Sequence, residues 1–402
     1  MANKTKKTSW VLTDTARRIW VESTELSATD LGIEGFPDAG VRRYTLRGGF
    51  CDGVDVVEVN NGAMSFAIVP TRGMGIWQGM FKGGRIGWDS PVVDPVHPKF
   101  VHLADRGGLG WLAGFNEWIV RCGLESNGAP CTDVVPNNMG QLAPIALNLH
   151  GRIANIPAHY VEVRVIPGPK PELCVTGIVD ESMLFCPQLR LSTNITTVIG
   201  SNAMKITDEV TNLKATSSEL ELLYHCNFGQ PFLDKGARLL IPASETAPRD
   251  ARAVEDIDSW QEYKGPTAGY VEQCYWHVPI ADGAGWTVAM LENAARNKGV
   301  AVRFNLNQMP CFTQWKNTGS VSDGYVTGLE PGTNYPNDKT FERQRGRVVM
   351  LSPGGKYRIE MTTEVHDTAA GVRKVEQEIA KLQKGQQRTV HCRPQAAFSS
   401  GA

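Results

Sequence analysis

The stretch at residues 223–231 (LYHCNFGQP) combines residue types that can move a proton. Apolar residues run into Tyr224, and a glycine and a proline then stop the run, which predicts the end of a β-strand. His225 stands at that end, between an aromatic residue and the amide of Asn227, and an imidazole so placed can transfer a proton to a bound ligand. Taken alone, such a histidine is more often a packed or surface residue.

Two further stretches place a polar group at a strand end beside glycine or proline. One is the segment at residues 149–152 (LHGR), and the other is Glu330, which precedes Pro331 and Gly332. A glutamate there can point its carboxylate into a concave face, where it can act as a base opposite an acid. By itself, a Glu-Pro pair is more often a solvated turn.

Together the three stretches resemble the aldose 1-epimerase (galactose mutarotase-like) superfamily. They are most similar to its uncharacterised branch, which is described only as a domain of unknown function. Three other segments carry the same resemblance: residues 70–75 (PTRGMG), 110–115 (GWLAGF) and 121–124 (RCGL). The resemblance covers roughly residues 45 to 367.

The resemblance implies an enzyme that interconverts the α and β anomers of a free sugar by opening its ring. Such an enzyme takes a proton from the anomeric hydroxyl and gives one to the ring oxygen, and no metal or organic cofactor is needed. It implies that Glu330 is the base and His225 the acid. We expect Glu330 ionised and His225 protonated at rest, facing each other across a pocket at the width of a sugar ring.

The same resemblance implies the residues that hold the sugar. His150 is similar to a family histidine that donates to a sugar hydroxyl or to the ring oxygen, and its neighbour Arg152 is expected to do the same. Arg72 stands where the family often carries a sugar-contacting arginine, whose fork suits adjacent hydroxyls or an anionic substituent. Asn227, beside His225, is a further expected contact, and so is Asn116, which lies in the irregular stretch at residues 95–157 and is not predicted by plain mutarotases.

Two features depart from the family pattern. The sugar-binding aspartate of the family has no clean counterpart, and four acidic residues are candidates for its place: Glu255, Asp256, Asp258 and Glu272. The irregular stretch at residues 95–157 also supplies contacts that plain mutarotases do not predict, among them Glu117 and Arg121. The expected partner is therefore a small-molecule sugar, and acidic, oxidised and phosphorylated sugars stay open.

Composition argues against several other classes of protein. The chain has 402 residues, of which 42% are hydrophobic and 21% charged, as in an ordinary globular protein. Its net charge of −1 creates no long-range field that favours nucleic acid or an anionic membrane. The first ten residues lack the apolar run of a signal peptide, and no segment has the ~20 apolar residues of a membrane helix. We expect a cytoplasmic protein.

Metal and cofactor chemistry is poorly supported by the motifs. The nine cysteines occur without a Cys-x-x-Cys pair, which is typical of a reducing cytoplasm. His97 and His102 are five residues apart and no other pair has ligand spacing, so no zinc site is expected. No glycine-rich nucleotide loop follows a strand, so no cofactor is expected.

Most of the chain has the pattern of short antiparallel strands. Residues 54–59 meet the turn at 60–62 (NNG), and residues 64–69 follow with the alternating residue pattern of a strand. More than a dozen further segments of this kind continue to residue 365 without a fixed repeat. The pattern predicts an all-β fold, a large antiparallel β-sandwich over residues 45–367.

Three segments differ from this pattern. Residues 1–44 are expected to form an N-terminal lead-in that starts with a mobile polar tail at residues 1–8. Residues 95–157 are expected to pack over one face of a sheet and to carry function. Within residues 368–402, apolar residues from Val372 to Leu382 have helical spacing, which predicts an amphipathic helix followed by a disordered tail.

Three functions remain open at this point. The first is a sugar mutarotase or closely related epimerase, the second a non-catalytic sugar-binding module, and the third a carbohydrate lyase or hydrolase on the same sandwich. The presence of both His225 and Glu330 argues against the bare module, and the lack of a signal peptide argues against a secreted lyase. The sugar, its preferred anomer and a homo-oligomeric state are not determined by the sequence.

Overall fold

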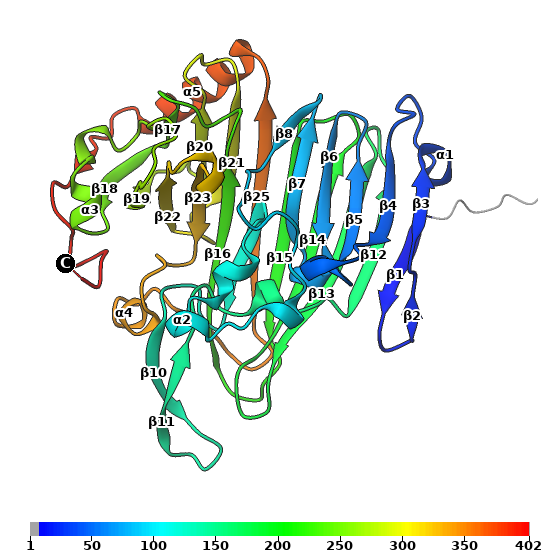
Figure 1. Cartoon of the computed structure of the whole chain (residues 1–402), viewed down its shortest axis with the longest axis horizontal. Coiled ribbons are helices and arrows are strands. Elements are labelled where there is room, and N and C mark those ends of the chain that lie inside the picture. The colour runs from blue at the N-terminus through cyan, green and yellow to red at the C-terminus, as the bar shows by residue number, and fades with distance from the viewer. Residues whose placement is uncertain (1–7, 402) are drawn as a thin grey trace, which may run out of the picture.

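The computed structural model describes residues 8–401 as two large sheets that face each other (Figure 1). The predicted polar tail, apart from residue 8, lies outside the described residues. Among the described residues, the named strands pair antiparallel except in the short parallel pair β18–β26. The all-β prediction, a large antiparallel β-sandwich, is confirmed.

The first sheet has ten strands. Their spatial order is β17 (Arg238–Leu240), β20 (Trp286–Glu292), β21 (Gly299–Asn305), β25 (Lys356–His366), β15 (Ala203–Asn212), β14 (Gln188–Val198), β13 (Glu172–Ser182), β12 (Tyr160–Ile166), β1 (Ser9–Asp14) and β2 (Ile19–Trp20).

The second sheet has fourteen strands and carries the candidate site. Its order is β26 (Thr389–Val390), β18 (Ala243–Pro248), β19 (Gln273–Pro279), β22 (Cys311–Asn317), β23 (Val326–Gly332), β16 (Ser218–Phe228), β9 (Ile119–Leu124), β7 (Gly75–Phe81), β6 (Met64–Val69), β5 (Asp55–Asn60), β4 (Gly40–Thr45) and β3 (Thr24–Ser27), with β24 (Val349–Leu351) beside β16 and β8 (Gly84–Ile86) beside β7.

The remaining elements connect or cover the sheets. A separate hairpin of β10 (Cys131–Pro136) and β11 (Leu142–Leu147) projects from the body in Figure 1. The α-helices are α1 (Ala28–Leu31), α2 (Asp105–Gly108), α3 (Ala251–Val254), α4 (Lys339–Gln344) and α5 (Ala369–Gln383). The 3-10 turns are η1 (Gly49–Cys51), η2 (Pro70–Arg72), η3 (Pro98–Phe100), η4 (Gly110–Gly114), η5 (Ile153–Asn155), η6 (Ile257–Ser259) and η7 (Val321–Asp323). Among residues 8–401 no helix is long and apolar enough to cross a membrane.

The two faces of β16 explain how the fold positions the site. Side chains alternate between the faces of a strand. Alternate residues of β16, from Leu220 to Phe228, belong to the main core between the sheets. Leu223 instead belongs to a second apolar cluster, outside the main core, with Trp111 and Phe115. His225 shares the face of Leu223, so the alternation directs its imidazole away from the main core.

The expected boundary at residue 45 is wrong. Strand β1 adds to the first sheet, with Ser9 opposite Arg164, while β3 and β4 continue the second sheet beside β5. These strands lie toward the far ends of the sheets and are short, so their side chains lack the regular alternation that marks a half-buried strand. The predicted lead-in is part of the sandwich.

The structure of the C-terminal segment agrees with the predicted helix but not with the predicted disordered tail. Helix α5 packs its apolar side, with Val372, Val375 and Ile379, on the outer face of the first sheet, which confirms the amphipathic helix. The tail beyond it is not disordered, because β26 pairs with β18 and Trp276 Nε1 donates to Ser399 Oγ at 2.8 Å. Sequence patterns did not indicate this because the partners of the tail lie more than a hundred residues away.

Candidate active site

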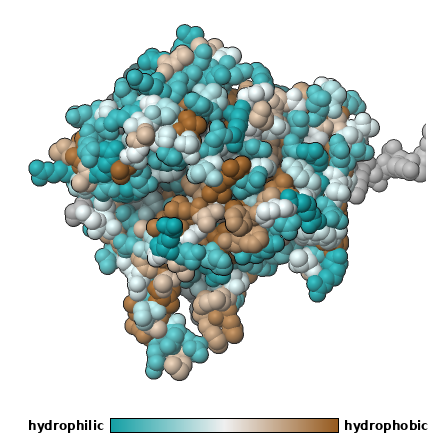
Figure 2. Space-filling view, viewed as in Figure 1, coloured by the Kyte–Doolittle hydropathy of each residue, from teal (hydrophilic) through white to brown (hydrophobic). Residues whose placement is uncertain are grey.

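A cavity of about 430 Å³ opens on the outer face of the second sheet. One wall is apolar and comes from the segment around η4, with Leu109, Trp111, Leu112 and Phe115. The opposite wall comes from β19, β22 and β23. Figure 2 shows this face of the molecule hollowed near its middle, with apolar surface beside the hollow. Enclosed, largely apolar pockets with a few polar groups are the usual form of a small-molecule site.

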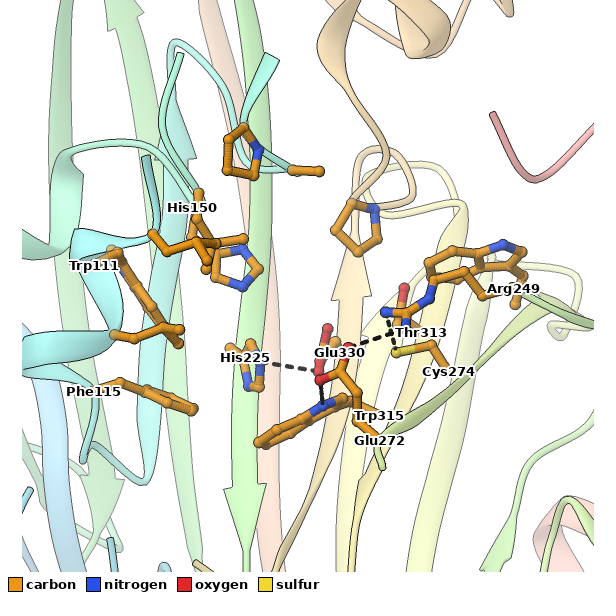
Figure 3. A pocket seen from close by; sticks show the side chains of 17 residues that line it. Trp111, Phe115, His150, His225, Arg249, Glu272, Cys274, Thr313, Trp315 and Glu330 are labelled. Carbon is orange, nitrogen blue, oxygen red and sulfur yellow. Dashed lines mark hydrogen bonds and ion pairs between the residues drawn. The ribbon is translucent and has the colours of Figure 1, made fainter. Parts of the chain in front are cut away.

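Two facing strands bring His225 and Glu330 together at the bottom of the cavity. Because β16 pairs with β23 in the register Cys226↔Leu329, His225 lies opposite Glu330. His225 Nε2 is 3.2 Å from Glu330 Oε1, and the two residues are 4% and 2% exposed. Figure 3 shows the two side chains pointing toward each other. The expectation of a sugar-ring width between them is wrong, because cross-strand neighbours touch.

Burial keeps both members of this pair neutral. It lowers the pKa of His225 well below its usual range, and the neighbouring His150 lowers it further. It raises the pKa of Glu330 well above its usual range, with a further contribution from the Glu272 carboxylate. Both shifts therefore disfavour the expected ion pair and favour a protonated carboxyl beside a neutral imidazole. The number of protons on the pair is unchanged, and only their place differs.

Glu330 keeps an oxygen available to a ligand. Among the described residues, Oε1 has no well-aligned hydrogen-bond partner, although Nε2 is in contact with it. Catalytic hydrogen bonds are often poorly aligned before a substrate is bound. Gly328 makes room for this carboxyl, since a Cβ at residue 328 would lie only 2.2 Å from Oε1. The absence of a side chain at residue 328 thus permits the observed position of the Glu330 carboxyl.

His150 lines the same cavity, but with the opposite hydrogen-bonding role from the one expected. Its Nδ1 is 2.8 Å from the carbonyl oxygen of Asn127, which can only accept, so Nδ1 carries the proton. Burial lowers the pKa of His150 to about 4, so the ring is neutral near pH 7. Nε2 is then an acceptor for a ligand hydroxyl and not a donor.

Of the four acidic candidates, Glu272 is the one that lines the cavity. Trp315 Nε1 donates to its Oε2 at 2.7 Å, and the Arg249 guanidinium lies 3.0 Å from its Oε1. Arg249 also pairs with Asp250 at 2.8 Å. This cation is therefore flanked by two carboxylates, and it leaves little net positive charge for an anionic ligand.

Arg72 does not reach the cavity, which corrects the expected sugar contact. Its side chain is fully buried, and Nε donates to Glu117 Oε1 at 2.7 Å. The other two nitrogens donate to Val96 O, Asn155 Oδ1 and Gly114 O, at 2.9–3.0 Å. Because each nitrogen is already bonded, Arg72 fastens the end of η4 and with it the apolar wall.

Four other expected contacts also lie elsewhere. Arg152 lines a separate cavity of about 180 Å³, behind the segment that carries His150. Asn116 is 4% exposed, and its Nδ2 donates to Val92 O in the wall. Asn227 is fully buried and bonds to His225 instead of facing the cavity. Arg121 pairs with Asp208 in the core.

Several residues of the cavity were missed by the sequence analysis. They come from β19, β22 and the loop before them: Arg249, Cys274, Trp276, Thr313 and Trp315. Thr313 lies opposite Glu330 in the register of β22 and β23, so strand alternation combined with that register would have found Thr313 and Trp315. The register itself is not visible in the sequence.

The fold places the chain in a known class. A galactose mutarotase-like protein from Clostridium acetobutylicum is 16% identical, with a TM-score of 0.56 over 82% of this chain and 99% of that chain. A galactose 1-epimerase from Lactobacillus acidophilus is 13% identical, with a TM-score of 0.50 over 82% and 99%. These likenesses show a galactose mutarotase-like fold. A protein of 36% identity with the same fold confirms the resemblance to that superfamily.

The chain belongs to the family described as "Domain of unknown function (DUF4432)", whose model matches residues 51–365. A Klebsiella pneumoniae protein provisionally named an aldose 1-epimerase is 36% identical, with a TM-score of 0.89 over 95% of this chain and 97% of that chain. No curated protein matches the chain.

Proposed function

We propose that this protein is a mutarotase of the aldose 1-epimerase type, which interconverts the anomers of a free sugar by acid–base ring opening. The observation that carries the proposal is the contact of His225 Nε2 with Glu330 Oε1, 3.2 Å apart at the bottom of an aromatic cavity. Buried titratable groups with shifted pKa values in a cleft are the usual mark of acid–base chemistry.

Direct contact suits this reaction better than a wide separation. The anomeric hydroxyl and the ring oxygen exchange protons during mutarotation, and both oxygens are bonded to the same carbon. Groups that serve them therefore stand side by side at one edge of the sugar, as His225 and Glu330 do on neighbouring strands. A binding module has no need for such a pair, since burying two titratable groups lowers stability.

One internal proton transfer prepares the pair for the reaction. Glu330 passes its proton to His225, which gives a carboxylate and an imidazolium. The carboxylate takes the proton of the anomeric hydroxyl while Nε2–H protonates the ring oxygen, and the bond between the anomeric carbon and the ring oxygen breaks. The open-chain carbonyl turns over and the steps reverse, which restores the one shared proton.

The cavity favours a neutral sugar over an acidic or phosphorylated one. Its cation, Arg249, is paired with Asp250 and Glu272, which removes the charge that would attract an anionic substituent. Glu272 and His150 offer acceptors for hydroxyl groups. The rings of Trp111, Phe115 and Trp315 provide apolar surface for the C–H face of a sugar.

Anomer exchange measured by polarimetry and NMR on free aldoses, ketoses and acidic sugars tests the proposal. Glu330→Gln and His225→Asn should each slow exchange by about 10²–10⁴-fold, while sugar binding, measured separately, weakens much less. The surface pair His391 and Glu245, 2.7 Å apart, offers matched controls, because His391→Asn and Glu245→Gln change the same chemistry away from the cavity.

Two outcomes would contradict the proposal. Wild-type exchange rates in both site variants, on the best substrate, would remove Glu330 and His225 from the reaction. A wild-type protein that binds a sugar but accelerates no exchange would instead be a sugar-binding module.

A further inference from the structure

Asn227 lies behind the imidazole of His225, on the side away from the cavity. It is two residues further along β16 and is fully buried. Its Oδ1 is 2.6 Å from His225 Nδ1. The contact is shorter than an ordinary nitrogen–oxygen hydrogen bond, and it occupies the ring nitrogen opposite the one that faces Glu330.

The orientation of this amide is set by two backbone carbonyls. Asn227 Nδ2 donates to Glu117 O at 2.9 Å and to His225 O at 3.1 Å. Carbonyl oxygens only accept hydrogen bonds, so the amide nitrogen must face them and the amide oxygen must face the ring. An amide oxygen also only accepts, and His225 Nδ1 therefore carries a proton.

This has a consequence for the other ring nitrogen. A neutral imidazole has one N–H group, so a proton on Nδ1 leaves a lone pair on Nε2. That lone pair faces Glu330 Oε1 at 3.2 Å. In the other tautomer, Nε2–H would face a protonated carboxyl, and no proton could pass from Glu330 to the ring.

We propose that Asn227 is a positioning residue that fixes His225 as the Nδ1–H tautomer, so that Nε2 can take the proton of Glu330. The catalytic role of the hydrogen bond between Asn227 and His225 rests on the proposed mutarotase function, whereas the assignment of the tautomer does not. Asn227 touches no part of the cavity, and it acts through the imidazole alone.

The titratable groups around the imidazole determine how the effect appears in a pH profile. Glu330 faces the ring from β23 and His150 faces it from the segment after β11, with ring centroids 5.5 Å apart. Glu272 and Arg249 act on the ring through Glu330. The Cys122 thiol, which lies near Glu330, has its pKa raised by burial and stays neutral.

The first experiment is ¹⁵N NMR of histidine-labelled full-length protein at rest, with the His225 signals assigned from His225→Asn. The wild type should show a protonated Nδ1 and an unprotonated Nε2 near pH 7. Asn227→Leu, which removes the acceptor at similar size, should lose this pattern. Asn227→Asp keeps an oxygen at Nδ1, so it should keep the Nδ1 proton and show a doubly protonated ring up to higher pH.

Kinetics then separate positioning from mere support of the fold. Asn227→Leu should lower kcat for anomer exchange by about 10²-fold or more with little change in KM. Asn227→Asp should stay within about tenfold of the wild type, with the acidic limb of its pH profile moved upward. Asn212→Leu is the matched control, because Asn212 is an equally buried amide bonded to the backbone, remote from His225.

The outcomes are distinguishable. A protonated Nε2 in the wild type, or an unchanged tautomer in Asn227→Leu, would overturn the positioning role whatever the activity. An altered tautomer in Asn227→Leu with an unchanged kcat would overturn it as well. If Asn227→Leu does not fold, Asn227→Asp decides through its pH profile. A wild type that shows the expected tautomer but no exchange refutes the mutarotase function alone.

Discussion

Replacing Arg72 by methionine should destabilise the protein strongly, because it breaks a fully buried ion pair. Arg72 and Glu117 are both 0% exposed at their side chains, with Nε and Oε1 2.7 Å apart. Methionine fills part of the space but leaves the Glu117 carboxylate without its cation. Removing one partner of a buried pair costs about 3–5 kcal/mol, and the freed carbonyls of Val96 and Gly114 add to this.

Urea unfolding of three variants measures this effect. Arg72→Met and Glu117→Gln should each lower the free energy of unfolding, Arg72→Met by about 3–5 kcal/mol. The double variant should lose less than the sum of the two, by roughly 0.5–3 kcal/mol, since it has no unpaired charge. The exposed pair Arg42 and Glu58, also 2.7 Å apart, is the control, and Arg42→Met there should cost under about 1 kcal/mol.

The opposite result would refute this reasoning. If Arg72 contacted the sugar, Arg72→Met would keep its urea midpoint and lose sugar binding. If Arg72 instead holds η4 in place, the free energy of unfolding should fall. Sugar binding by the folded protein should then weaken only to the extent that the wall carrying Trp111 moves.

Two further predictions concern carboxyl groups of the second sheet, those of Glu330 and Glu221. Gly328→Ala should keep most of the stability but slow anomer exchange, because the new Cβ would lie 2.2 Å from Glu330 Oε1 and would push this oxygen away. Gly283→Ala is the control, since a Cβ there would have no atom within 4 Å. Equal exchange rates in the two variants would contradict the prediction. Burial raises the pKa of Glu221 to about 8 from 4.5, so its protonated form favours the folded state fully below pH 4.5, and this contribution is lost as pH rises through 8. The glutamine of Glu221→Gln does not titrate. The free energy of unfolding of this variant, minus that of the wild type, should therefore rise between pH 4.5 and 8, by at most about 1.4 kcal/mol per pH unit. A difference that stays constant over this pH range in urea unfolding would contradict the prediction.

The fold class followed from local patterns, whereas the roles proposed for His225 and Glu330 came from the resemblance to the aldose 1-epimerase superfamily. Alternation along segments such as β14, in which every second residue is buried, is imposed by the pleat and is visible without any partner strand. The apolar stripe of α5 is visible for the same reason. His225 and Glu330 could be singled out because each stands close to a glycine and a proline that predict the end of a strand. For Glu330 that prediction is wrong in detail, because β23 continues through Pro331 to Gly332.

The tertiary structure decided what these residues do to one another. The register of β16 against β23 put His225 and Glu330 in contact, and burial favours the neutral form of both side chains. Arg72 was misassigned because its hydrogen-bond partners, which use each of its nitrogens, come from segments 24 to 83 residues away. Glu272 could not be told apart from three other acidic residues until β19 and β22 paired. Residue types and periodicity are local properties of a chain, whereas distance, burial and hydrogen-bond satisfaction depend on which distant segments meet.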